Sequence, residues 1–91
     1  MIYLGQIVAS IKIFPKDIII SVDQIKEAIK NSLPNNVKVH KFVEEPIAYG
    51  LVALLAHIII PETEGLLQKV ENILQNIEGV SQTEVVLVRK I

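Results

Sequence analysis

The longest apolar stretch of the chain, residues 51–60, constrains the fold more than any other segment. His57 is its single polar interruption. The stretch is about half as long as the ~20 residues that a membrane-spanning helix needs, but it has the length of a strand. Because it is apolar on both faces, it is typical of a strand in the middle of a sheet. The sequence therefore predicts a sheet built around this segment.

Three further segments have the pattern of strands. Residues 6–14 alternate between apolar and polar side chains, and residues 37–43 largely do the same. Residues 83–90 are rich in Val, which favours strands. Pro15 is expected to end the first of these strands, and the Glu44-Glu45-Pro46 step is expected to disrupt the second.

Two helices are predicted between these strands. In the first, Ser21 and Gln24 have the spacing of a capping box, apolar residues follow at helical intervals, and Pro34 ends the helix. In the second, Thr63 is the expected N-cap, and Gly79 follows the helix at a position suited to a left-handed backbone.

The resulting order is β-α-β-β-α-β, which is the ferredoxin-like split βαβ pattern. Right-handed crossovers place the four strands in one antiparallel sheet, with both helices on one of its faces. No linker or low-complexity run divides the chain. We therefore expect an α+β sandwich formed by a single domain over residues 1–91.

Composition argues against several classes of protein. The chain has 9 Lys and Arg against 10 Asp and Glu, and a net charge of −1 gives no general attraction to nucleic acid or to anionic membranes. The absence of Cys excludes disulfides and thiolate metal sites, and it fits a cytoplasmic protein. The first residues lack the basic region of a signal peptide.

Lysines on the strands offer one candidate site. Lys12, Lys38 and Lys41 could line a phosphate or RNA surface. However, RNA-binding modules of this fold also stack bases on strand aromatics, and the first strand has only Phe14. The pattern therefore favours a solvated polar edge over a nucleic-acid surface.

Metal binding and acid–base chemistry are weakly indicated. His40 and His57 have no partner at ligand spacing, so structural or surface roles are favoured over a metal site. Glu44 and Glu45 are neighbours in an extended segment, so their side chains point to opposite faces and do not share a proton. The chain has no nucleophile–base constellation and no Gly-rich phosphate loop. We expect neither an enzyme nor a bound cofactor.

Tyr49 and Lys90 have two interpretations each. Tyr49 precedes Gly50 in an expected turn, where an exposed aromatic is a frequent binding anchor, although core or local packing is the more common outcome. Lys90 lies near the end of the last strand, where a frayed, solvated lysine is usual. An ammonium there could also compete with a metal ion for phosphates or carboxylates.

The chain resembles the archaeal translation elongation factor 1-beta family over essentially its whole length. The resemblance rests on residues 8–13, 44–54, 77–81 and 84–91. The segment Glu-Glu-Pro-Ile-Ala-Tyr-Gly-Leu, at residues 44–51, is its specific part. The family implies guanine-nucleotide exchange on elongation factor 1-alpha, the GTPase that brings aminoacyl-tRNA to the ribosome. Such a factor engages the GDP-bound partner and weakens GDP by favouring the nucleotide-free state.

The resemblance also implies roles for individual residues. Lys90 matches a lysine that eukaryotic relatives insert near the magnesium and phosphate site of the partner, and Tyr49 matches an aromatic that enters a pocket on another domain. Flanking residues are expected to support these contacts, namely Glu45, Pro46, Ile47, Gly50 and Arg89. The third and fourth strands both run antiparallel to the first, so Tyr49 and Lys90 are expected at opposite ends of the sheet, roughly 25–30 Å apart.

Two other classes of protein share parts of this pattern. Ligand-binding regulatory modules of the ACT type have the same strand order and favour an Ile/Leu-x-Gly-Val step, which residues 77–80 provide. Such modules usually dimerise and are fused to an enzyme. The second alternative is a small homo-oligomeric interaction domain that uses its open sheet face. Substitution of Lys90 distinguishes them, because only the exchange hypothesis predicts lost activity with an intact fold.

Overall fold

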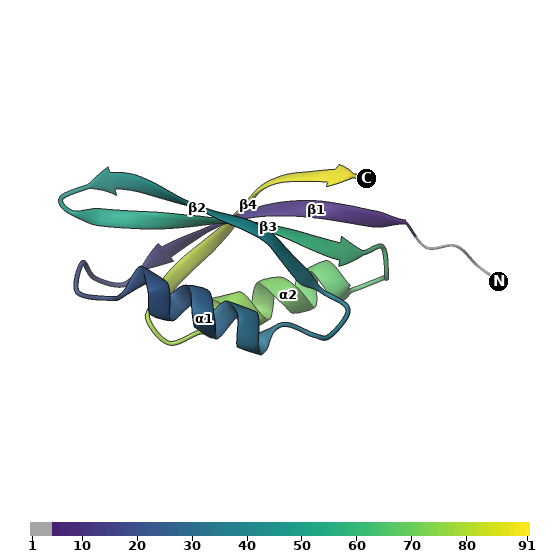
Figure 1. Cartoon of the computed structure of the whole chain (residues 1–91), viewed down its shortest axis with the longest axis horizontal. Coiled ribbons are helices and arrows are strands. Elements are labelled where there is room, and N and C mark those ends of the chain that lie inside the picture. Colours follow the sequence, from purple (N-terminus) through teal and green to yellow (C-terminus); the bar gives the residue numbers. More distant parts are fainter. Residues whose placement is uncertain (1–4) are drawn as a thin grey trace.

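A computed structural model describes residues 5–91 and places them in four strands and two helices. Figure 1 shows both helices below a single twisted sheet. The elements follow the predicted order, and their bounds are β1 Gln6–Pro15, α1 Val22–Ser32, β2 Lys38–Ala48, β3 Leu51–Pro61, α2 Leu66–Gln75 and β4 Val80–Lys90. The ferredoxin-like α+β prediction is confirmed.

The sheet has the strand order β2-β3-β1-β4, and every neighbouring pair is antiparallel. The apolar run in β3 is therefore an inner strand, as its composition predicted. β1 is the other inner strand, and β2 and β4 form the two edges. The molecule is elongated, with principal extents of 50 × 20 × 17 Å.

The core lies between the sheet and the helices. On β1, the side chains of Ala9, Ile11 and Ile13 are fully buried, because alternate residues of a strand point to the same face. Helical spacing buries one stripe of each helix against them, represented by Ile29 on α1 and Leu74 on α2. Within residues 5–91, no helix is both long and apolar enough to cross a membrane.

The two helices begin differently. The Ser21 side chain caps α1 as predicted, with Oγ accepting a hydrogen bond from the Gln24 backbone N–H at 3.3 Å. The prediction that Thr63 caps α2 is wrong. Its carbonyl instead accepts a turn hydrogen bond from the Leu66 N–H at 3.1 Å, and the N-cap is Gly65, with a left-handed φ of 80°. The helix therefore begins after this turn, at Leu66.

The prediction that Glu44-Glu45-Pro46 disrupts the strand is also wrong, because β2 continues through these residues to Ala48. Pro46 still pairs with Val52 of β3 in the register. Proline lacks a backbone N–H, and an edge strand tolerates this when that position faces away from the neighbouring strand. The location of β2 at the edge therefore explains why the proline does not end it.

β4 contains a bulge near its middle. Ser10 of β1 pairs with Leu87, whereas the next residue, Ile11, pairs with Val85. Val86 is therefore the extra residue on β4. A bulge of this kind changes which side chains of the strand point to each face of the sheet.

Candidate functional site

A two-residue turn, Tyr49-Gly50, joins β2 to β3. Ala48 and Leu51 pair across it, and both central residues have positive φ, 53° for Tyr49 and 81° for Gly50. This is the pattern of a type I′ hairpin turn, in which Gly is favoured and a bulky residue is rare. The Tyr49 side chain is 96% exposed, so core packing is excluded and the predicted turn location is confirmed.

An apolar side chain from a second segment, that of Ile18, lies beside this turn. A methyl carbon of Ile18 lies 3.6 Å from the position that a Cβ on Gly50 would take. Ile18, Ile19 and Ile47 are all exposed. Sequence reasoning missed Ile18 and Ile19, two of the three isoleucines of the 16–21 loop, because nothing in the local pattern shows that this loop meets the hairpin.

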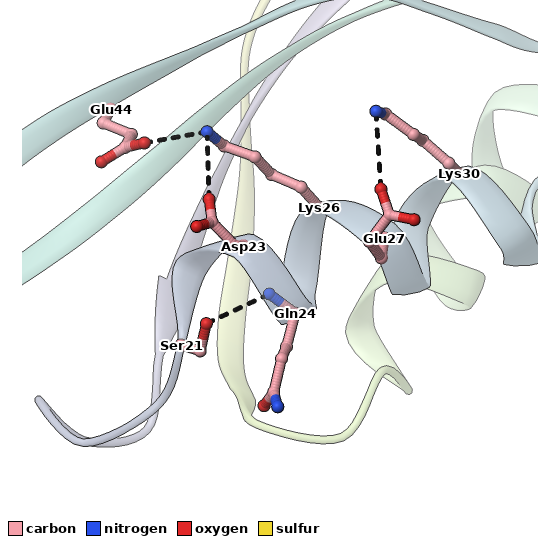
Figure 2. A network of polar contacts seen from close by, with 7 residues as sticks. All are labelled: Ser21, Asp23, Gln24, Lys26, Glu27, Lys30 and Glu44. Atoms are coloured by element: carbon pink, nitrogen blue, oxygen red, sulfur yellow. Dashed lines mark hydrogen bonds and ion pairs between the residues drawn. The ribbon is translucent and has the colours of Figure 1, made fainter.

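Glu44 and Glu45 do point to opposite faces, as the strand alternation predicted. Glu45 forms an ion pair with Lys12 at 2.7 Å, and Glu44 forms one with Lys26 of α1 at 2.8 Å. Figure 2 shows the Lys26 ammonium between Glu44 and Asp23. The hydrogen bond that the Lys26 ammonium donates to Glu44 raises the pKa of Lys26 above its ordinary value. Both glutamates thus serve as ion-pair partners in the hairpin.

Lys90 lies at the other end of the sheet. It is the last residue of β4 and pairs with Ile7 in the register, so its backbone is held in the strand rather than frayed. Its Nζ lies 3.7 Å from a Glu62 carboxylate oxygen, and its side chain is 81% exposed. An exposed pair at this distance contributes little stability, which leaves the ammonium available to a partner.

The two ends are far apart. Ile7 pairs with Ile60 near the end of β3, while Tyr49 precedes the first residue of that strand. At about 3.3 Å per strand residue, the path between Tyr49 and Lys90 along the sheet is about 35 Å. Figure 1 shows the β2–β3 turn and the end of β4 on opposite sides of the molecule. The predicted opposition of the two residues is confirmed, with a somewhat longer separation than expected.

His57 belongs to neither end and lies in the middle of β3. Its Nδ1 is 2.7 Å from the hydroxyl of Ser10, which is directly opposite on β1 and only 6% exposed. Burial lowers the pKa of His57, and the nearby positive charges of Lys41, His40 and Arg89 lower this pKa further. Among residues 5–91, no three His, Asp or Glu side chains are arranged to hold a metal ion.

Comparisons with known proteins identify the family. Residues 8–91 match the family described as EF-1 guanine nucleotide exchange domain. Similar proteins are named Elongation factor 1-beta. That of Staphylothermus marinus is 40% identical over 97% of this chain and 99% of the relative. That of Sulfolobus acidocaldarius is 46% identical over 89% of this chain and 91% of the relative. That of Methanothermobacter thermautotrophicus is 39% identical over 97% and 99%. The chain belongs to the EF-1 guanine nucleotide exchange domain family.

Proposed function

We propose that this chain promotes exchange of GDP for GTP on elongation factor 1-alpha. The observation that carries the proposal is the family match over residues 8–91, together with relatives named Elongation factor 1-beta along nearly their whole length. The factor makes and breaks no covalent bond. It binds the GDP-bound GTPase, favours its nucleotide-free form and so weakens GDP by linkage. A cytoplasmic location follows from this role.

Lys90 is the proposed exchange residue. Its exposed ammonium enters the magnesium and phosphate site of the partner and takes the place of part of the charge of the metal. Because magnesium neutralises the β-phosphate, disturbing its ligands weakens the nucleotide. The weak pairing of Lys90 with Glu62 supports the proposal, since little energy is lost when this side chain is withdrawn.

Tyr49 is the proposed anchor on a second domain of the partner. Its near-complete exposure at the tip of a two-residue turn supports this role, because an exposed aromatic can be buried in a pocket of the partner. The neighbouring residues Glu45, Pro46, Ile47 and Gly50 shape the hairpin around it. Arg89, next to Lys90 on β4, would contact the partner at the other end.

Release of fluorescent GDP from the cognate elongation factor 1-alpha tests both parts of the proposal. Wild-type protein should accelerate GDP release strongly. In Lys90→Ala the acceleration should be smaller by a factor of roughly ten or more, with an unchanged circular dichroism spectrum. Lys69→Ala, which removes an exposed lysine from α2, is the matched control and should behave as wild type. An amino-acid-dependent thermal shift would instead favour the ACT-type alternative.

The outcomes separate the function from its mechanism. Absence of acceleration by the wild-type protein, with an active GTPase, would overturn the exchange proposal. Full acceleration of GDP release by Lys90→Ala would leave the proposed exchange function standing but would show that Lys90 is not the residue responsible.

A further inference from the structure

The sheet face opposite the helices contains a cleft of about 390 Å³ near the Lys90 end. Its apolar part is formed by Val8 and Ile59 from the two inner strands and by Ile91. Its polar part comes from three strands and comprises His40 and Lys41 of β2, His57 of β3 and Arg89 of β4. The volume is in the range of sites that take small organic ligands.

Every ionisable side chain that lines this cleft is basic. Within residues 5–91, Lys41 and Arg89 lie outside every ion pair, and residues 1–4 contain no Asp or Glu. Lys12, farther along the same face, is neutralised by Glu45 instead. In a chain of net charge −1, this local excess of positive charge is a property of the site and not of the composition.

His57 provides a neutral donor between these cations. The nearly buried Ser10 hydroxyl lies 2.7 Å from Nδ1 of His57, and it can donate its proton there when His57 is the neutral tautomer that is protonated on Nε2. A neutral imidazole that accepts at Nδ1 carries its own proton on Nε2, so an N–H donor remains for a ligand. The lowered pKa of His57 is consistent with this neutral form near pH 7.

We infer that this cleft binds a small organic anion through a phosphate or carboxylate group. Lys41 and Arg89 supply the charge from the two edge strands, and His57 supplies a hydrogen bond from the middle of the sheet. The apolar residues contact the uncharged part of the ligand. Fixed donors and uncompensated cations around a partly apolar cleft are the features by which proteins recognise oxyanions.

The test is an NMR titration of the isolated protein at constant pH. Inorganic phosphate and acetate are added separately, each against sodium chloride at matched ionic strength, because salt alone screens exposed charges. The proposal predicts saturable shifts of the amide signals of Lys41, His57 and Arg89 with at least one oxyanion. Comparison of the two ions distinguishes a phosphate site from a carboxylate site.

Lys41→Gln is the diagnostic variant, since Lys41 is exposed and its replacement should leave the fold intact. It should weaken the apparent affinity by roughly tenfold, the effect of losing one charge-assisted contact. Lys69→Gln, on the helical face, is the matched control and should bind as wild type. Shifts that rise linearly and equally with chloride, or equal affinity in Lys41→Gln, would overturn the proposal. The titration needs no GTPase, so its result is independent of the exchange assay.

Discussion

Tyr49 adopts a backbone conformation that bulky side chains rarely take. Its φ of 53° is in the left-handed region, which costs a non-glycine residue of the order of 1–3 kcal/mol. No burial offsets this cost, because the side chain is almost fully exposed. The exposed side chain therefore gains no packing in return for this strain, which agrees with its proposed role as an anchor.

This explanation predicts that Tyr49→Asn makes the protein more stable and less able to bind. Asn tolerates the left-handed conformation, so the free energy of unfolding should rise by about 1 kcal/mol, and the melting temperature by about 4–8 °C for a domain of this size. Affinity for elongation factor 1-alpha should fall. Thermal unfolding and a binding titration check the two effects, and a less stable variant would contradict the strain argument.

At the scale of elements, the two helix starts give a controlled comparison. Ser21→Ala should destabilise the protein by about 1 kcal/mol, since Ser21 Oγ accepts a hydrogen bond from the Gln24 backbone N–H in the first turn of α1. Thr63→Ala should change stability by less than about 0.5 kcal/mol, because Thr63 is outside α2 and exposed. Urea unfolding measures both, and equal losses would show that our assignment of the two caps is wrong.

The same elements show what could be predicted from sequence. Hydrophobic periodicity predicted the order of all six elements, because each buried face leaves a local pattern. The continuation of β2 past Pro46 was not predictable locally, since it depends on β2 lying at the edge of the sheet. The roles of Tyr49 and Lys90 were proposed from the family resemblance and remain predictions. The basic cleft was missed because its residues come together only through pairing of distant strands, such as Lys41 with His57.

At the scale of the whole molecule, the separation of about 35 Å between Tyr49 and Lys90 makes their effects independent. Changes this far apart usually combine additively in free energy, so the reductions in exchange rate caused by Tyr49→Ala and Lys90→Ala should multiply in the double variant. At saturating concentrations, Tyr49→Ala should recover nearly the wild-type rate, whereas Lys90→Ala should remain slow. Recovery of both or of neither would contradict separate anchoring and exchange ends.

The bulge at Val86 has a consequence for the two cations that follow it. In the observed register, Arg89 is opposite Val8 and faces the cleft, while Lys90 is opposite Ile7 on the face that carries Glu62. If Val86 were paired without a bulge, every later residue would shift by one and the two side chains would exchange faces. The single inserted residue therefore determines that the side chains of Arg89 and Lys90 lie on opposite faces of the sheet.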